Sequence, residues 1–357
     1  MKREDLQPVY SFKLRGAYNK ISQLTDAQKA AGVITASAGN HAQGVAMASK
    51  QLGIKAIIVM GRNTPSIKVN AVKDRGAKVI LHGDNYDEAS IHAKLLCKEQ
   101  GLTFIPPYDD AEVIAGQGTI GLEIVNQHNG PIDAIFIPVG GGGLLAGVAA
   151  YVKHLHPKTR IIGVEVEGSN CMDAALRAGK RVKLPLETLD LFADGVSVAQ
   201  AGLLPFKIAR KYVDEIVVVN IDEICAAIKD VFEDTRGVSE PAGALAIAGM
   251  KRYLADHPGL SSVVAIVSGA NVNFDRLRHI SERAEVGEAR EAVLAVTIDE
   301  AQGSFLKFCR ALGKRSITEF NYRYADATGA HIYVGLGVAQ KEDRLDVVEN
   351  LQSKGYL

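Results

Sequence analysis

The chain of 357 residues has no tryptophan and only four cysteines, which are Cys97, Cys171, Cys225 and Cys309. These cysteines lie far apart and form no C-x-x-C pair, a pattern that excludes a disulfide-rich secreted domain. We therefore expect buried thiols in a reducing compartment, the cytoplasm. Basic and acidic side chains both number 41, so the net charge gives no reason to expect a nucleic-acid partner.

Apolar segments of the kind that cross or enter a membrane are also scarce. The chain opens with charged residues rather than an apolar signal segment. The stretch that most resembles a membrane span is 134–152, with 19 residues and no charge. It contains Pro138 and four consecutive glycines, which would leave backbone groups unpaired in lipid. We expect a buried strand, a glycine turn and a buried helix there, and no membrane association.

The length favours about two domains, and 47% apolar with 23% charged residues is ordinary globular composition. Apolar, β-branched runs alternate with segments of helical period. Continuous apolar strands between helices predict an α/β fold with parallel sheets that helices cover on both faces. The predicted strands lie at 33–35, 55–60, 78–81, 134–139, 161–166, 215–219 and 263–267.

The pattern changes near residue 290. A strand at 292–298 is followed by a helix, by a strand at 318–324 with alternating aromatic residues, by a strand at 331–338 and by a second helix. This βαββα order predicts a ferredoxin-like module. The fourth strand of such a module would begin where the sequence stops, so we expect a partial module.

Four glycines, Gly140 to Gly143, connect a predicted strand directly to a predicted helix. Their N–H groups and the helix N-terminus predict a phosphate site. Gly141, Gly143 and Ala146 also fit the G-x-G-x-x-A dinucleotide fingerprint, with Glu165 at the end of the next strand. A nicotinamide-dependent oxidoreductase therefore stays open as an alternative.

Lys13 lies near the start of a predicted amphipathic helix. With Ser11 as the N-cap, the amine is in the first turn, where the helix dipole disfavours its cation. Such an amine suits a nucleophile that condenses with a carbonyl. A solvated surface lysine is the usual interpretation of a lone lysine, and this residue alone does not decide between the two.

A third glycine-containing loop, Ser37 to His41, follows the strand at 33–35. Hydroxyl, amide and imidazole groups at a helix start suit a carboxylate. His41 by itself is more typical of a packed or capping histidine. The sequence contains neither the H-x-x-x-H or C-x-x-C spacing of a metal site nor the G-x-S-x-G motif of a nucleophile elbow.

Four motifs occur in one order along the chain: SFKLRGA from Ser11, SAGNH from Ser37, the four glycines and SGAN from Ser268. Together they closely resemble the fold-type II pyridoxal-phosphate enzymes, and within them the biosynthetic threonine dehydratases. The resemblance implies a tryptophan synthase β-like fold at 1–289, with a small subdomain of about 33–125 inserted in the large one. It also implies an ACT-like regulatory module, here partial, at 290–357.

The resemblance implies a role for each motif residue. Lys13 would bind pyridoxal 5'-phosphate covalently and move the Cα proton of the substrate, and Ser268 would meet the pyridine nitrogen. The other implied cofactor residues are Phe12 beside the ring, Asn40 at the phenolic oxygen, and Gly140, Gly141, Gly142, Gly143 and Leu144 at the phosphate. The implied substrate-carboxylate residues are Ser37, Ala38, Gly39, Asn40 and His41.

The implied reaction is the conversion of L-threonine to 2-oxobutanoate and ammonia, with L-serine giving pyruvate as a side activity. This is the first step of isoleucine biosynthesis, so isoleucine is the expected allosteric inhibitor and a homotetramer the expected assembly. Ala38 stands where related racemases have a second serine, which favours a dehydratase. Glu165 fits one position of the racemases' divalent-ion site, but Cys171 replaces the second acid, so we expect no metal. A non-catalytic fragment of such an enzyme is the remaining alternative.

Overall fold

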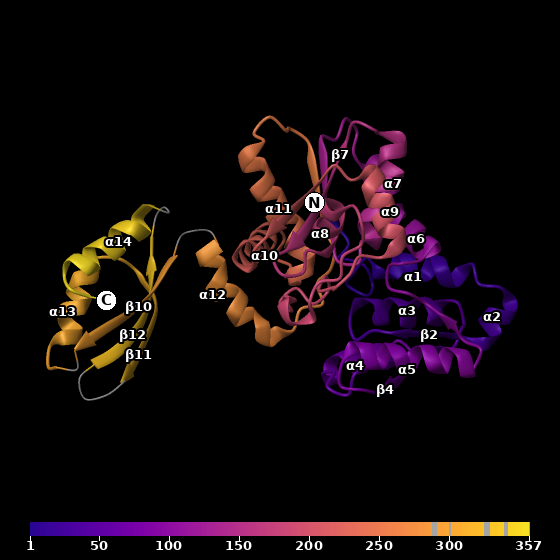
Figure 1. The fold of residues 1–357 in the computed structure, drawn as a ribbon, viewed down its shortest axis with the longest axis horizontal. Helices are drawn as coiled ribbons and strands as arrows, with labels where there is room; N and C mark the ends of the chain where they lie inside the picture. Colours follow the sequence, from indigo (N-terminus) through magenta and orange to yellow (C-terminus); the bar gives the residue numbers. More distant parts are fainter. Residues whose placement is uncertain (288–290, 300, 325–328, 339–341, 357) are drawn as a thin grey trace. The chain divides into compact units, whose positions relative to one another are not determined.

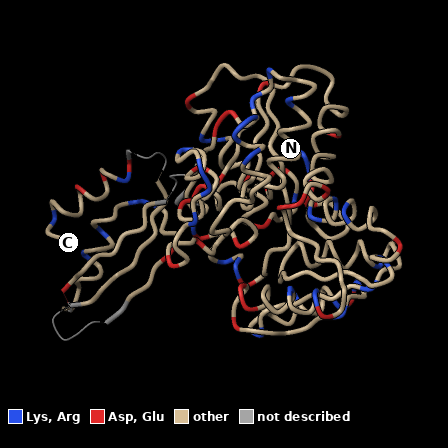
Figure 2. The backbone as a smooth tube through the Cα atoms, turned by 45° about the vertical axis from the view of Figure 1, so that its right-hand side comes forward, with Lys and Arg blue, Asp and Glu red and all other residues tan. Residues whose placement is uncertain are grey.

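The computed structural model describes residues 1–287, 291–299, 301–324, 329–338 and 342–356 (Figure 1). The chain divides into two compact units. Unit 1 contains residues 1–221 and 230–273, and unit 2 contains residues 222–229 and 274–357. Positions of basic and acidic residues are intermixed along the backbone of each unit (Figure 2). Unit 1 contains every residue that the sequence suggests for a cofactor site.

The larger sheet of unit 1 has five strands in the order β1-β9-β6-β7-β8, and all neighbouring pairs are parallel. Strand β6 is buried along its whole length, as its unbroken apolar sequence predicts. Since β6 and β9 run side by side in one direction, the loops after them emerge at the same edge. The strands are β1 (Lys2–Arg3), β6 (Ala134–Pro138), β7 (Arg160–Val166), β8 (Glu215–Val219) and β9 (Val263–Val267).

Helices cover both faces of this sheet. Helices α7 and α9 lie on one side of β7, and α11 lies on the other (Figure 1). On the α11 side, the ring of Tyr253 meets that of Phe136 edge to face at 5.5 Å. The helices between β6 and β9 are α7 (Gly143–Leu155), α8 (Cys171–Ala178), α9 (Leu203–Tyr212), α10 (Ile221–Thr235) and α11 (Pro241–Asp256).

The smaller sheet of unit 1 has the order β4-β3-β2-β5 and is also parallel. One face packs on α3 and α4, whereas α5 covers the other with Ala89 and Ala93. Its strands are β2 (Val33–Ala36), β3 (Ala56–Met60), β4 (Lys78–Leu81) and β5 (Thr103–Phe104). The helices of this region are α1 (Lys13–Ser22), α2 (Asp26–Ala31), α3 (Asn40–Gln51), α4 (Ser66–Lys73), α5 (Tyr86–Glu99) and α6 (Ala111–Gln127).

Helix α6 contacts α1 on one side and α7 on another. Glycines bring these helices together main chain to main chain. A Cβ on Gly116 of α6 would lie 2.7 Å from the Cα of Gly16 in α1. A Cβ on Gly147 of α7 would lie 2.6 Å from the backbone nitrogen of Gly118 in α6. Because the obstructing atoms are backbone, a larger residue at these points would push the helices apart.

Unit 2 contains an antiparallel sheet with the order β10-β12-β11. Phe308 and Leu312 of α13 and Val347 and Leu351 of α14 pack on one face of it. The order of strands and helices is the predicted βαββα. The elements are α12 (Leu277–Gly287), β10 (Glu291–Asp299), α13 (Ser304–Leu312), β11 (Ile317–Tyr324), β12 (Gly329–Gly337) and α14 (Glu342–Ser353).

The predicted α/β class with two parallel sheets and a ferredoxin-like module is confirmed, but three details are wrong. The sequence did not predict β1 and β5, which have two residues each. The N-cap of α1 is Phe12 rather than Ser11, although the Ser11 hydroxyl accepts the backbone N–H of Lys13 at 3.2 Å. All four cysteines are free thiols, but only Cys171 and Cys225 are buried, while the other two are partly exposed.

None of the described helices is both long enough and apolar enough to span a membrane.

Candidate active site

The three glycine-containing loops meet beside the first turn of α1. The backbone N–H of Phe12 donates to the carbonyl of Ser268 at 3.2 Å, which joins α1 to the loop after β9. The Asn271 side chain donates to Oδ1 of Asn40 at 2.7 Å, which joins that loop to the one after β2. Tyr108 lies against the glycine loop after β6 and follows Pro107, which accepts a hydrogen bond from Lys13. The predicted motifs therefore form one site.

The amine of Lys13 lies inside this site. Nζ donates to the carbonyl of Pro107 at 3.0 Å and lies 5.2 Å from the centre of the Phe12 ring. Burial lowers the pKa of Lys13 to about 8, and the opposing attraction of the Glu240 carboxylate is smaller. An appreciable fraction of this amine is therefore neutral near pH 7, as nucleophilic attack on a carbonyl requires.

Each glycine from Gly140 to Gly143 has its own reason to lack a side chain. A Cβ on Gly140 would lie 2.8 Å from the Cα of Val196, and one on Gly141 would lie 2.4 Å from the ring of Tyr108. Gly142 has a φ of +91°, a conformation that favours glycine. A Cβ on Gly143 would lie 3.0 Å from the Cα of Tyr108. Gly143 also begins α7, so its N–H and that of Leu144 belong to a helix N-terminus.

This loop fits the phosphate of a bound cofactor. It consists of backbone without side chains, and the first N–H groups of α7 have no partner inside the helix. Ser268 lies at the carboxyl end of β9, and its hydroxyl donates to the carbonyl of Ala242 at 3.2 Å. These groups suit pyridoxal phosphate. The glycine loop suits its phosphate, the amine of Lys13 suits its aldehyde, and the hydroxyl of Ser268 suits its ring nitrogen.

The loop from Ser37 to His41 leads into α3, which begins at Asn40. The hydroxyl of Ser37 accepts the N–H of Gly39 at 3.3 Å. His41 is buried, and its Nε2 lies 2.9 Å from the carbonyl of Ile105. Burial, followed by the nearby Lys13 cation, lowers the pKa of His41 to about 3, so this ring is neutral. Because the imidazole of His41 contacts the carbonyl of Ile105, we expect backbone N–H groups of this loop, rather than the ring, to bind a carboxylate.

Sequence reasoning missed Glu240, which is buried and accepts a hydrogen bond from Nδ2 of Asn40 at 2.6 Å. Burial raises the pKa of Glu240 to about 7. It packs so tightly on the loop after β9 that a Cβ on Gly269 would lie 2.3 Å from its Oε1. The one feature of the sequence that could have drawn attention to Glu240 is its place directly before Pro241, at the start of a helix of small apolar residues.

Sequence reasoning also missed Tyr108, whose ring covers Gly141 and whose Cβ lies against Gly143. Burial raises the pKa of Tyr108 to about 12, so its hydroxyl stays protonated. The sequence places this tyrosine after two prolines in a loop far from the glycines, and no local pattern links the two.

Glu165, on which both the dinucleotide and the divalent-ion hypotheses depended, has a structural partner. It is fully buried and accepts the backbone N–H groups of Met172 at 2.9 Å and Asp173 at 2.8 Å, so it caps the start of α8. Burial raises the pKa of Glu165 to about 8, against the effect of these N–H donors. In the described part of the chain, no group of three or more His, Cys, Asp or Glu side chains could hold a metal.

Comparison with known protein families gives two matches along the chain. Residues 1–269 match the pyridoxal-phosphate dependent enzyme family. Residues 282–357 match the C-terminal regulatory domain of threonine dehydratase. The first match covers the whole candidate site, and the second covers the predicted regulatory module.

Curated relatives and solved structures agree with these matches. The chain is 54% identical over 361 residues to the biosynthetic L-threonine dehydratase IlvA of Burkholderia multivorans, covering 100% of this chain and 71% of that protein. It is 55% identical over 358 residues to its Escherichia coli counterpart, covering 100% and 69%. The processed form of threonine deaminase isoform 2 from Solanum lycopersicum superposes with a TM-score of 0.77 at 51% identity, over 79% of this chain and 82% of that one.

These findings confirm the predicted family, fold class and pyridoxal-phosphate cofactor. They do not support the nicotinamide oxidoreductase or the non-catalytic fragment. The chain belongs to the pyridoxal-phosphate dependent enzymes, among the biosynthetic threonine dehydratases.

Proposed function

We propose that this protein converts L-threonine to 2-oxobutanoate and ammonia, and L-serine more slowly to pyruvate and ammonia. The observation that carries the proposal is the Lys13 amine, held with a lowered pKa where the three glycine-containing loops meet. The identity above 50% to biosynthetic threonine dehydratases supports threonine as the substrate.

Pyridoxal phosphate, when bound, supplies an aldehyde that condenses with amines and a ring that withdraws electrons from the substrate Cα. Lys13 would hold it at the aldehyde carbon, Gly140 to Leu144 would hold the phosphate, and Phe12 would pack beside the ring. Asn40 would donate to the phenolic oxygen, and Glu240 fixes the orientation of the Asn40 amide. The Ser37 to His41 loop would bind the substrate carboxylate through its N–H groups.

Ser268 would face the pyridine nitrogen. A serine hydroxyl does not stabilise a protonated pyridine ring as a carboxylate does, so the ring would draw less of the negative charge away from Cα. Prompt loss of the β-hydroxyl is then favoured over other outcomes. Lys13 takes the Cα proton on one face, and Ala38 offers no hydroxyl to return a proton from the other. Threonine loses one water, and hydrolysis of the resulting imine consumes one water and releases ammonia, so atoms balance.

The match of residues 282–357 to the regulatory domain supports allosteric control of this reaction. We propose isoleucine as the inhibitor, because the reaction begins its synthesis. A cytoplasmic homotetramer is the proposed state of the enzyme, and 290–357 the proposed limits of the regulatory module.

The experiment that tests the function compares Lys13→Ala with Lys20→Ala, a lysine on the same helix that pairs with Asp110 instead. Purified protein is supplied with pyridoxal phosphate and L-threonine, and 2-oxobutanoate and the visible absorption of bound cofactor are measured. Lys13→Ala should lose both signals and Lys20→Ala should keep them. Turnover by Lys13→Ala equal to that of the parent would overturn the proposal.

A further inference from the structure

Arg15 lies two residues after Lys13 and uses every N–H of its guanidinium. Nε and Nη2 donate to the two oxygens of Glu4 at 2.7 and 2.8 Å. Nη1 and Nη2 donate to the two oxygens of Glu123, both at 2.7 Å. The fifth N–H, on Nη1, donates to Oγ1 of Thr119 at 3.1 Å. Two bidentate carboxylate contacts on one guanidinium leave it no freedom to turn.

The charges of this group balance. Glu4 is fully buried, and Lys2 contacts Glu123, so two acids face two bases. We call Lys2, Glu4, Arg15 and Glu123 the Arg15 cluster. Hydrogen bonds from Arg15 are the main reason that the pKa of Glu123 falls to about 2, so this carboxylate stays ionised. Removing Arg15 would leave the buried Glu4 without its bidentate partner.

The cluster joins three elements that carry the site. Glu4 follows β1, and its backbone N–H donates to the carbonyl of Val267 at 2.9 Å, one residue before Ser268. Arg15 belongs to the first turn of α1, which presents Lys13. Glu123 and Thr119 belong to α6. The cluster therefore links the helix turn that carries Lys13 to β9, the strand directly before Ser268.

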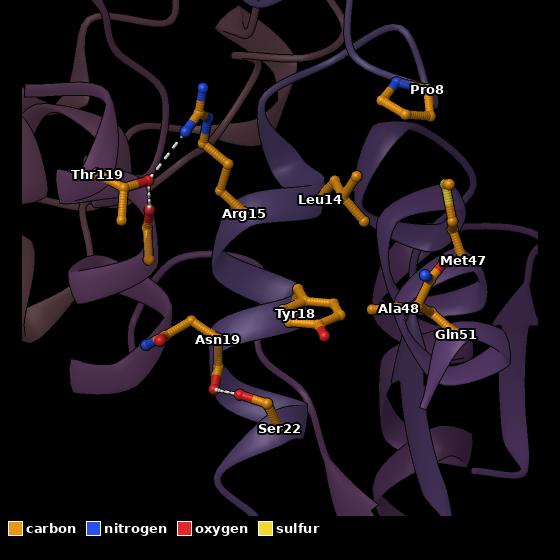
Figure 3. A pocket seen from close by; sticks show the side chains of 11 residues that line it. Pro8, Leu14, Arg15, Tyr18, Asn19, Ser22, Met47, Ala48, Gln51 and Thr119 are labelled. Atoms are coloured by element: carbon orange, nitrogen blue, oxygen red, sulfur yellow. Dashed lines mark hydrogen bonds between the residues drawn. The ribbon is translucent and has the colours of Figure 1, made fainter. Parts of the chain in front are cut away.

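Figure 3 shows how α1 is held from both sides. Arg15 reaches toward Thr119, while Leu14 and Tyr18 face Met47 and Ala48 of α3. An open pocket of about 470 Å³ lies over α1, and its lining comes from α1, α3 and α6. On the α6 side, the hydrogen bonds of Arg15 and the close approach of Gly16 hold the helix.

We propose that Arg15 is a positioning residue, which fixes the first turn of α1 so that the Lys13 amine points to Pro107 and the site. This inference rests on the proposed function, since it assigns Lys13 as the reacting amine. Lysine cannot replace Arg15, because a single ammonium cannot make two bidentate contacts at once. A displacement of about 1 Å at a reacting group costs on the order of 100-fold in rate.

The test compares Arg15→Lys and Glu123→Gln with the control Lys20→Met. Lys20 is on the same helix and also pairs with a residue at α6, since its Nζ lies 2.9 Å from Asp110 at the N-cap. In protein without cofactor, the reaction of each lysine with trace acetic anhydride is followed by peptide mass spectrometry from pH 6 to 11. In protein with pyridoxal phosphate, kcat and KM for threonine are measured.

In Arg15→Lys, the pH at which Lys13 labelling reaches half its maximum rate should rise toward the ordinary lysine pKa. In the same variant, kcat should fall about 10- to 100-fold, and KM should change less than threefold. Glu123→Gln should do the same to a smaller degree. Lys20→Met should change neither the midpoint nor kcat. The inference is overturned if Arg15→Lys and Lys20→Met give the same midpoint and the same kcat. If the parent protein makes no 2-oxobutanoate, the proposed function fails, and the labelling midpoints alone decide the role of Arg15.

Discussion

Replacing Gly141 with alanine tests the contact between the glycine loop and Tyr108. The new Cβ would lie 2.4 Å from ring carbons of Tyr108, against an ordinary carbon contact of about 3.5–4.0 Å. Overpacking of this kind costs about 1–3 kcal/mol. Without cofactor the loop can move to relieve the clash, but a bound phosphate holds the loop in place. We therefore expect the cost in binding, as a rise of about 5- to 150-fold in the Kd of pyridoxal phosphate.

The same substitution in a Tyr108→Ala background locates the cause. Without the ring, Gly141→Ala should change the Kd less than about threefold, so the two substitutions should be strongly non-additive. Gly259→Ala is the matched control, because its Cβ would meet no atom within 4 Å. Titration of each protein with pyridoxal phosphate, followed by absorption of the bound cofactor, gives the five Kd values. Equal Kd values for the parent and Gly141→Ala would refute the reasoning.

Three further predictions concern ionisation. Capture of pyridoxal phosphate by cofactor-free protein can be trapped with borohydride, and its rate should rise with pH with a midpoint near pH 8, because the neutral Lys13 amine is the nucleophile. A midpoint near pH 10 would contradict the burial of this amine. In Glu240→Gln that midpoint should fall, because the Glu240 carboxylate raises the pKa of Lys13; an upward shift would contradict it. His41 has a pKa of about 3 when folded and about 6.5 when unfolded, so below pH 6.5 only the unfolded chain takes up its proton. The free energy of unfolding, measured with urea, should therefore fall by up to about 1.4 kcal/mol per pH unit below pH 6.5, and His41→Gln should flatten this slope; identical slopes would exclude the effect.

The loops of the site could be predicted from the sequence because each carries its own local signal. Gly140 to Gly143 and the segments at Ser37 and Ser268 all follow short apolar strands, and parallel strands bring their carboxyl ends to one edge. Local patterns were therefore sufficient to place these loops at one edge.

Glu240 and Tyr108 could not be predicted in the same way. Their importance comes from contacts across the chain, with Asn40 in one case and Gly141 in the other. The two-residue strands β1 and β5 are too short for an apolar period, and pairing with a neighbouring strand defines them. Glu165 fitted a ligand motif, but its carboxylate is used by the N-terminus of α8.

The glycines at which α6 contacts α1 and α7 fix the distances between the backbones of these helices. Helix α1 starts at the lysine and α7 starts at the end of the glycine loop, and both lie on α6 backbone against backbone. The spacing between the first turn of α1 and the glycine loop is consequently set by main-chain contacts, which repacking of side chains alone cannot change.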